Sequence, residues 1–402
     1  MNGTAAEMRG DPTRRNVFLL SLCLGFSMTG AVVVMTVSAL TGQMLAEDKA
    51  LATLPFALQW IASMAATMPA SLFMRRFGRR AGFTLGQSFG LLAALGCTVA
   101  VMAGSFWAFA LTNACFGIHN AFWQYYRFAA ADTAPENFRS KAISLTLAGG
   151  VVAALLGPEL SKLSVDLLAP ATFAGSYLII GLLCLVTTSI LQFLRIPRPT
   201  AVERADSGRP LRQIAAQPVF IVAVLSATLG YATMALIMTA TPLAMVACGF
   251  SFSQTASVIQ WHVLAMYVPS FFTGALIRRF GVHRIVATGT LLLAGCAAVG
   301  LSGVALEQFF GALVLLGLGW NFMFIGGTSL LTGAHTQAER AKVQGFNDFL
   351  VFSSVSLASA ASGLLQNRFG WEALNYGILA PALAVLAAVL WLRIGGRGPK
   401  PA

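Results

Sequence analysis

The chain has 402 residues, of which 57% are hydrophobic and only 10% are charged. Roughly a quarter of the residues in an ordinary soluble domain are charged, so the composition excludes a soluble globular protein and indicates a membrane protein. The formal net charge of +12 would suit a nucleic-acid partner. We expect none, because the basic residues lie in loops that alternate with apolar segments, and the expected partner is the lipid bilayer.

Apolar segments of membrane-spanning length recur along the whole chain. A helix of about 20 residues crosses the ~30 Å hydrocarbon core of a bilayer. Twelve such segments lie at residues 16–42, 50–73, 82–104, 105–131, 142–165, 172–194, 218–241, 253–277, 284–305, 307–334, 343–366 and 373–393. In lipid the backbone must satisfy its own hydrogen bonds, which favours helices, and the sequence lacks the short alternating segments of a β-barrel. The predicted fold class is an all-α membrane protein with 12 transmembrane helices.

The Lys and Arg residues are distributed unevenly between the two ends of these segments. All but Lys49, Lys162 and Arg368 lie on one side, which makes 23 of the 26. Loops rich in Lys and Arg stay in the cytoplasm. We therefore expect both termini to be cytoplasmic, which an even number of spans also requires.

Two pairs of short basic motifs indicate an internal duplication. Arg75-Arg76-Phe77-Gly78 follows the second segment, and Arg278-Arg279-Phe280-Gly281 follows the eighth, 203 residues later. Arg139-Ser-Lys141 precedes the fifth segment, and Arg340-Ala-Lys342 precedes the eleventh, 201 residues later. Self-similarity at a fixed offset is typical of repeated structural units. We predict two six-helix halves, residues 1–194 and 218–402, joined by a polar cytoplasmic linker at 195–217.

Four soft metal ligands lie in the seventh and eighth segments. Met234 and Met238 are four residues apart, as are His262 and Met266, so each pair shares one face of a helix. Thioether and imidazole groups at membrane depth suit a soft ion, and Cu(I) fits best. The predicted depths form a descending ladder from Met238 to Met266, along which copper would pass as transported substrate. No bound cofactor is expected.

Further soft ligands could extend this path. Cys248 lies in the short outer connection after the seventh segment, where an arriving ion would meet it. The two remaining methionine pairs with helical spacing in the first half are candidates too: Met28 and Met35, and Met64 and Met68. Core packing is the ordinary role of methionine in a helix, and it stays open for all of these.

Ionisable groups within or near the spans are functional candidates, because burying a charge in a membrane is costly. His119 lies in the middle of the fourth segment, and Arg127 lies near its inner end with Asp132 as the predicted partner. Asp348 lies near the inner end of the eleventh segment. We expect these four residues to take part in gating and charge balance.

The loop with Phe77-Gly78-Arg79-Arg80 resembles the basic loop motif of the major facilitator superfamily, which usually reads Gly-x-x-x-Asp-Arg-x-Gly-Arg-Arg. Ser71 and Arg75 stand where that motif has Gly and Asp. The stretch from Gly149 to Pro158 is similar to the superfamily's glycine-rich motif of the fifth helix, which is often linked to exporters. The resemblance covers the whole chain and implies a two-half transporter that works by alternating access.

A closer resemblance rests on the two pairs MxxxM and HxxxM in helices seven and eight. With Met234, Met238, His262 and Met266 at those positions, the chain is similar to the CcoA-type copper importers, the CalT group. That resemblance implies import of copper, as Cu(I), across the bacterial inner membrane for assembly of haem–copper cytochrome oxidase. A cytoplasmic copper chaperone would be the receiving partner.

Two other functions remain open. A major facilitator that exports a small amphipathic organic compound would need an aromatic cavity, for which the candidates are Trp60, Trp107, Trp123, Trp261 and Phe322. A copper-binding membrane protein without transport activity is the second. An enzyme is not expected, because the sequence shows no nucleophile–base pair, phosphate loop or closed zinc set.

Overall fold

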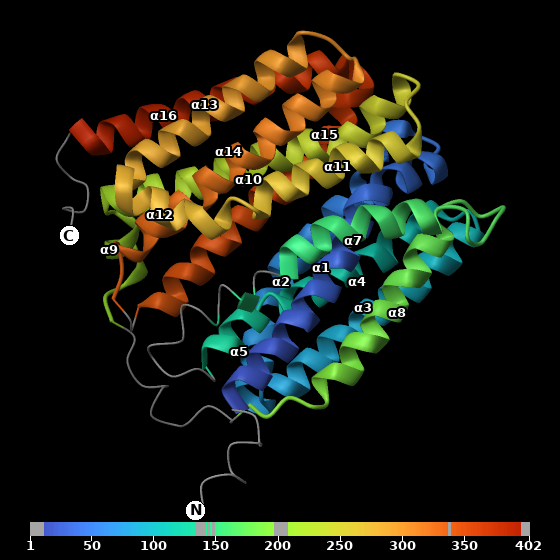
Figure 1. Cartoon of the computed structure of the whole chain (residues 1–402), viewed down its shortest axis with the longest axis horizontal. Helices are drawn as coiled ribbons and strands as arrows, with labels where there is room; N and C mark the ends of the chain where they lie inside the picture. The colour runs from blue at the N-terminus through green and yellow to red at the C-terminus, as the bar shows by residue number, and fades with distance from the viewer. Residues whose placement is uncertain are drawn as a thin grey trace, which may run out of the picture. The chain divides into compact units, whose positions relative to one another are not determined.

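The computed structural model describes residues 12–132, 142, 145–146, 149–196, 208–336 and 339–394. The regular elements in these ranges are all helices (Figure 1). The first half of the chain contributes α1 (Pro12–Leu45), the 3-10 helix η1 (Lys49–Leu51), α2 (Leu54–Phe77), α3 (Arg79–Met102), α4 (Phe106–Trp123), α5 (Tyr126–Asp132), α7 (Gly149–Ser164) and α8 (Ala174–Leu191). The second half contributes α9 (Leu211–Ala215), α10 (Pro218–Ala247), α11 (Phe252–Tyr267), α12 (Ser270–Phe280), α13 (Val282–Leu301), α14 (Leu306–Thr332), α15 (Arg340–Gly377) and α16 (Leu379–Ile394).

Eight helices in the described ranges are long and apolar enough to cross a membrane, judged by length and composition. The all-helical fold predicted from the sequence is therefore present, whereas the count of twelve spans and the cytoplasmic position of the termini stay predictions. Residues 139 and 141, which belong to the second repeated motif, lie outside the described residues.

Several predicted segments differ from the helices because local backbone chemistry interrupts them. The segment predicted at 253–277 is divided into α11 and α12 just before Ser270, where Pro269 lacks the backbone N–H that would continue the hydrogen bonding of α11. The segment at 105–131 is divided into α4 and α5 after Trp123. The boundary predicted at 366–373 is present as a kink inside α15, because Gly370 has the non-helical angles φ 75° and ψ −174°.

The chain divides into two compact units. Unit 1 comprises Met1–Val34 and Ala65–Glu203, and unit 2 comprises Met35–Met64 and Arg204–Ala402. The C-terminal part of α1 and the first turns of α2 thus belong with the helices of the second half. The predicted division at 195–217 stays a prediction.

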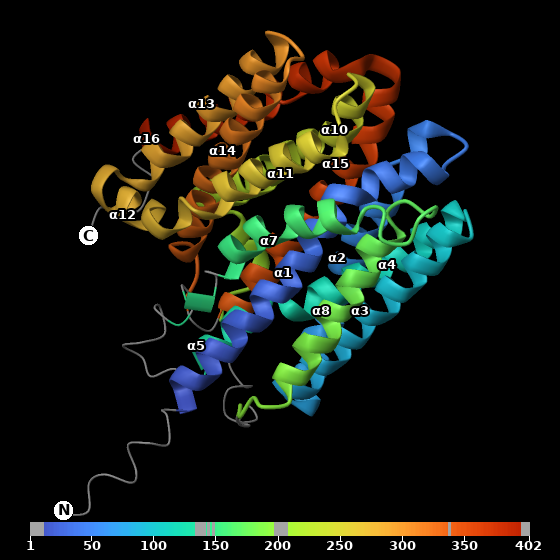
Figure 2. The ribbon, with the colours of Figure 1, turned by 45° about the vertical axis from the view of Figure 1, so that its right-hand side comes forward.

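In unit 1, helices α3, α4 and α8 pack side by side (Figure 2). The start of α1 is joined to the residues that follow α8 by a reciprocal pair of hydrogen bonds. The Asn16 amide nitrogen donates to the carbonyl of Arg195 at 2.8 Å, and the Arg195 N–H donates to the Asn16 amide oxygen at 3.2 Å. These two hydrogen bonds join residues that are 179 positions apart in the sequence, and they fix the backbone position of Arg195.

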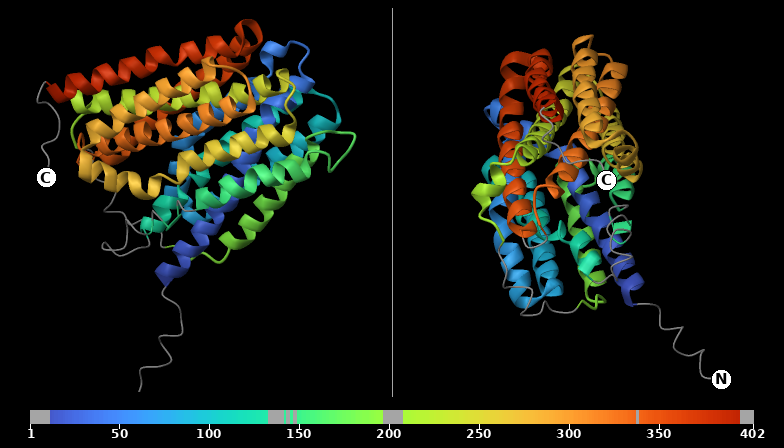
Figure 3. Two further views of the ribbon diagram at one scale, coloured as in Figure 1. Left: turned by 45° about the horizontal axis from the view of Figure 1, so that its top comes forward. Right: turned by 90° about the vertical axis from the view of Figure 1, so that its left-hand side faces the viewer.

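In unit 2, α14 packs against α10, α11 and α13, and α10 also packs against α15 (Figure 3). Helix α14 approaches α11 and α10 closely at two of its glycines. A Cβ at Gly317 would lie 2.5 Å from the His262 carbonyl oxygen, and one at Gly327 would lie 2.9 Å from the Ala223 carbonyl oxygen. The Ser226 hydroxyl donates across the α10–α14 contact to the Met323 carbonyl at 2.9 Å. Small residues and hydrogen bonds of this kind are what holds helices together in a membrane.

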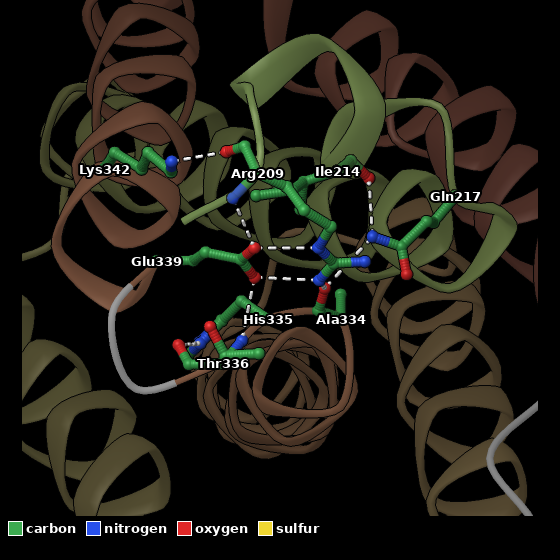
Figure 4. A network of polar contacts seen from close by, with 8 residues as sticks. All are labelled: Arg209, Ile214, Gln217, Ala334, His335, Thr336, Glu339 and Lys342. Carbon is green, nitrogen blue, oxygen red and sulfur yellow. Dashed lines mark hydrogen bonds and ion pairs between the residues drawn. The ribbon is translucent and has the colours of Figure 1, made fainter. Parts of the chain in front are cut away.

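A charged network joins the segment before α9 to the turn between α14 and α15 (Figure 4). Arg209 donates from Nε and Nη2 to the two carboxylate oxygens of Glu339, each at 2.7 Å. The backbone N–H groups of Arg209 and Thr336 donate to the same carboxylate, and Lys342 donates to the Arg209 carbonyl. These donors, the Arg209 guanidinium first and the Thr336 N–H next, hold the pKa of Glu339 well below its ordinary value.

The repeated loops share one unusual backbone conformation, which supports the predicted duplication. Gly78 has φ 91° and ψ 160°, and Gly281 has φ 84° and ψ 147°, and each precedes the first residue of the next helix. Side chains other than glycine rarely adopt positive φ. The same Phe-Gly dipeptide therefore makes the same turn twice, 203 residues apart.

Replacing Gly281 by Ala should destabilise the protein. No heavy atom lies within 4 Å of the position a Cβ would take, so the cost comes from the positive φ alone and should be about 1–2 kcal/mol. The matched control is Gly274→Ala on α12, where the surroundings are equally open and the backbone is helical. That control should gain about 0.5–1 kcal/mol. Thermal unfolding in detergent measures both, and equal melting temperatures would contradict the strained turn.

The Arg209–Glu339 pair should show energetic coupling. Arg209→Gln and Glu339→Gln should each lower the melting temperature, and the double variant should be little worse than either single one, because one interaction is lost in all three. Since the pKa of Glu339 is lowered, its stabilising effect is present at every pH above the unfolded value of about 4.3 and is lost only as the pH falls through the lowered value. The difference between wild type and Glu339→Gln should therefore be constant between about pH 5 and pH 8.

The control for this pair is Arg212→Gln, which removes one exposed charge from the neighbouring helix α9. It should leave the melting temperature unchanged. Additive losses from Arg209→Gln and Glu339→Gln would show that the two side chains act independently.

Candidate transport site

Five aromatic side chains of unit 2 form what we call the aromatic cluster: Trp60, Tyr231, Trp320, Phe324 and Phe352. The Trp60 ring stacks on Phe352 with centroids 5.7 Å apart and meets the edge of Tyr231 at 6.0 Å. Tyr231 in turn lies 5.3 Å from Trp320 and 5.5 Å from Phe324. Offset-stacked and edge-to-face geometries at these distances are favourable beyond the burial of area.

Four helices supply these rings, and the sequence places them by helical spacing. Trp320 and Phe324 are four residues apart on α14, so their rings stack with centroids 5.0 Å apart and planes within 9° of parallel. Tyr231 lies on α10, with Ala227 one turn before it and Ala235 one turn after it, both buried. These alanines leave room beside Tyr231, so that the Trp60 ring from α2 reaches it, and Phe352 of α15 stacks on Trp60.

The cluster rests on a small apolar core. Ala227, Ala235, Val351 and Val355 are buried, and Met64 packs against them. The Met64 sulfur accepts a hydrogen bond from the Ser353 hydroxyl at 2.9 Å. Met64, one of the candidate copper ligands, therefore belongs to the surroundings of the aromatic cluster.

Polar atoms without partners lie beside the rings. The indole Nε1 atoms of Trp60 and Trp320 and the hydroxyl of Thr228 are buried and form no hydrogen bond within the described residues. A buried polar group without a partner costs about 1–3 kcal/mol, and buried indole N–H groups usually have one. The aromatic cluster therefore combines flat rings with two N–H donors that have no partner among the described residues.

The four predicted copper ligands are buried on α10 and α11. Met234, Met238 and Met266 are 2–3% exposed, and His262 is fully buried. His262 Nδ1 lies 2.8 Å from the Leu313 carbonyl oxygen, so Nδ1 carries the proton and donates, and Nε2 is buried with no hydrogen-bond partner among the described residues. Both helices pack on α14, and the convergence of all four groups on one ion stays a prediction.

The additional soft ligands differ in exposure. Met28 is buried, Met35 is half-buried, and Met68 is 72% exposed, although it lies one turn from Met64. Cys248 is exposed at the end of α10. Among the described residues, no group of three or more His, Cys, Asp or Glu side chains is arranged to hold a metal ion.

His119 and Arg127 have local contacts in unit 1. His119 is buried, and its Nδ1 lies 3.0 Å from the Gly86 carbonyl oxygen. The Arg127 guanidinium lies over the Phe128 ring, 4.8 Å from its centroid.

Of the two acidic gating candidates, Asp132 and Asp348, the structure describes only one side chain. Asp132 ends α5, and its side chain lies outside the described residues, so the predicted pairing with Arg127 stays a prediction. Asp348 is half-buried on α15 and accepts a hydrogen bond from the Asn347 side chain at 3.2 Å.

Only one of the five aromatic residues suggested by the sequence lies in the aromatic cluster, namely Trp60. Trp107 and Trp261 are 62% and 55% exposed, as expected of side chains that face lipid. Trp123 donates from its indole nitrogen to Asn120 at 2.8 Å. The i, i+4 spacing of Trp320 and Phe324 was the signal that could have found the other face of the cluster.

Membrane-length helices, a repeated loop geometry and a cluster of aromatic rings among the helices define a polytopic transport protein. The model of the Major Facilitator Superfamily matches residues 17–266 and 224–402, which is nearly the whole chain. The chain belongs to that family, and its members are transporters rather than enzymes.

Three curated relatives share 30% identity or more with the chain. The chain is 42% identical over 389 residues to the riboflavin transporter RfnT of Brucella anthropi, covering 96% of this chain and 97% of the relative. It is 30% identical to each of two uncharacterized MFS-type transporters of Bacillus subtilis, YdeG and YddS, over 94% and 93% of this chain.

The fold also matches a solved transporter structure. The crystal structure of the D-xylose-proton symporter superposes with a TM-score of 0.75 over 95% of this chain and 97% of that one, at 14% sequence identity. This likeness shows the shared fold.

Proposed function

We propose that the chain is a secondary transporter of riboflavin, or of a closely similar planar heteroaromatic compound, in the bacterial inner membrane. The observation that carries the proposal is the 42% identity to a riboflavin transporter along almost the full length of both chains. The chemistry of the aromatic cluster supports it independently of that likeness.

The aromatic cluster suits a flat tricyclic ring. Isoalloxazine presents a large π-face and, at its edge, carbonyl oxygens and ring nitrogens that accept hydrogen bonds. Within the aromatic cluster the rings of Trp320 and Phe324 lie parallel, which is the arrangement in which flat rings stack. The indole N–H groups of Trp60 and Trp320 supply donors that have no protein partner within the described residues. A carrier must also release its cargo, and a few stacking contacts of about 0.5–1.5 kcal/mol each allow that.

A neutral cargo changes the energetics of transport. Membrane potential drives a single positive charge such as Cu(I) inward with ~2.3 kcal/mol per 100 mV, and it exerts no force on uncharged riboflavin. Accumulation would then require a coupled ion or consumption of the product inside the cell. We assign any coupled proton to the ionisable groups His119 and Asp348, of which the first is buried and the second half-buried.

Copper transport is the second candidate function. The feature in its favour is His262, which lies on the same helix face as Met266 and whose buried Nε2 has no partner in the part of the chain that the structure describes. The relatives named above give the copper cargo no support, and a carrier of an organic compound, the alternative raised from the sequence, fits them better. Riboflavin is therefore the preferred cargo.

Truncating either tryptophan of the cluster should weaken riboflavin uptake. Trp60→Ala and Trp320→Ala each remove a stacking surface and a hydrogen-bond donor, so we expect the KM for riboflavin to rise roughly 3- to 10-fold, which corresponds to about 0.7–1.4 kcal/mol. The measurement is uptake of radiolabelled riboflavin by cells of a riboflavin auxotroph that express each variant at equal level.

The matched controls are Trp107→Ala and Trp261→Ala, which remove tryptophans that are more than half exposed. Both should leave the KM unchanged. Wild-type cells that take up no more riboflavin than cells with empty vector would refute the proposed cargo. Equal losses in all four variants would refute the aromatic cluster as its binding site.

The copper hypothesis is tested by Met238→Leu and His262→Leu. If copper is the cargo, both variants should abolish uptake of radiolabelled copper. If riboflavin is the cargo, the wild type transports no copper. Met238→Leu conserves volume in the core and should then keep riboflavin uptake, while His262→Leu strands the Leu313 carbonyl and should lose about 1–3 kcal/mol of stability. Measuring both uptakes in one set of cells separates the two functions.

A further inference from the structure

A cavity of about 920 Å³ lies in unit 1, where α2 ends, α3 begins and the chain leaves α8. We call it the basic pocket. Its polar lining is formed by Arg79, Arg80, Thr84, Ser88, Gln192 and Arg195. It lies at the end of the helices that the distribution of basic residues assigns to the cytoplasm. Neither the aromatic cluster nor the proposed riboflavin transport involves it.

The side chains that line the pocket within the described residues carry positive charge. Three arginines line it, and no carboxylate does. Within the described residues neither Arg80 nor Arg195 forms an ion pair, and Arg79 lies over the Tyr125 ring, 5.6 Å from its centroid. Guanidinium groups bind phosphate with paired, charge-assisted hydrogen bonds, so the pocket suits a phosphate group.

Hydrogen bonds hold the Arg80 guanidinium and the Arg195 backbone in place before any ligand binds. Arg80 donates from Nη2 to the Gln192 side-chain oxygen at 2.8 Å, and the Gln192 nitrogen donates to the Thr84 hydroxyl at 3.2 Å. Asn16 fixes the backbone of Arg195 through the reciprocal pair described above. Preorganised donors lose less freedom on binding, which raises affinity.

The surface beyond the pocket is suited to acyl chains. The two helices that meet there, α3 and α8, carry large exposed apolar side chains along their lengths: Leu92, Leu95, Val99, Leu182, Leu185 and Val186. A soluble phosphate compound would make no use of this surface. A phospholipid would use both features, with its headgroup in the basic pocket and its chains along the helices.

We propose that the basic pocket binds the headgroup phosphate of an anionic phospholipid of the cytoplasmic leaflet. The lipid phosphate accepts hydrogen bonds from Arg80 and Arg195, and the Thr84 and Ser88 hydroxyls bind the glycerol of a phosphatidylglycerol headgroup. An occupied pocket fastens the start of α3 to the end of α8 within unit 1.

The test is lipid binding by the purified full-length transporter in detergent. Phosphatidylglycerol is titrated against wild type and against the double variant Arg80→Gln/Arg195→Gln, with bound lipid counted by native mass spectrometry. We expect the dissociation constant to rise at least about tenfold, the effect of losing one charged hydrogen bond. Phosphatidylcholine should bind both proteins equally and weakly.

The matched control is Arg278→Gln/Arg279→Gln, which removes two exposed arginines from the corresponding loop of the other repeat. It should bind phosphatidylglycerol as wild type does. If the control loses phosphatidylglycerol affinity to the same extent, the effect comes from net charge alone, and the proposed site is overturned. Unchanged binding by Arg80→Gln/Arg195→Gln would overturn it as well.

Glycerol 3-phosphate is the competitor that separates a lipid from a soluble phosphate. It should displace phosphatidylglycerol only at far higher concentration, because it has no acyl chains, and displacement at equal concentration would overturn the lipid assignment. If the double variant is unstable, Arg80→Lys/Arg195→Lys keeps both charges and removes the paired geometry. It should then bind phosphatidylglycerol more weakly than wild type, and wild-type affinity would count against the site.

Discussion

Helix α14 approaches α10 and α11 so closely that a side chain larger than hydrogen would collide with their backbones at Gly317 and Gly327. Lipid offers helices no hydrophobic reason to associate, so dispersion contacts at such close approaches and hydrogen bonds like that of Ser226 must hold them. The position of α14 then determines that of Trp320 and Phe324, which are two of the five rings of the aromatic cluster. The candidate site is thus a consequence of helix packing, and a larger residue at either glycine would displace it.

The amino-acid sequence was sufficient for the class of fold because hydropathy and the distribution of basic residues report directly on the bilayer. It was less reliable for where helices end. Pro269 divides one predicted span into α11 and α12, and the span predicted at 105–131 is divided into α4 and α5. Such interruptions depend on whether neighbours satisfy the backbone groups that are released, and a single sequence does not state that. The repeat was readable, because the turn at Phe77-Gly78 and Phe280-Gly281 demands glycine in both copies.

The copper prediction and the aromatic cluster show why residue spacing alone is ambiguous in a membrane helix. Met234 and Met238 are four residues apart, which suits a shared ligand, and it equally suits two side chains that fill one groove of the core. Their burial at 3% and 2% is what packing requires. Trp60 and Phe352 lie 292 positions apart, and their stacking has no signature in the local sequence. Contacts across such separations follow from the tertiary fold, whereas i, i+4 pairs such as Trp320 and Phe324 can be read directly.

The loops at Gly78 and Gly281 have the same backbone turn but different side chains, so the roles of backbone and side chains can be told apart. Both copies begin a long helix directly after a glycine of positive φ, so the frame is common to the two. After that glycine the first copy continues with Arg79-Arg80, and the second continues with Val282-His283. In the first copy those arginines line the basic pocket. Gln192 accepts a hydrogen bond from Arg80, and Asn16 donates one to the backbone carbonyl of Arg195. The glycine of positive φ therefore accounts for the backbone turn in both copies. The turn itself does not require the arginines, and the proposed phosphate ligand gives them a role beyond the superfamily motif and the positive charge of the loop.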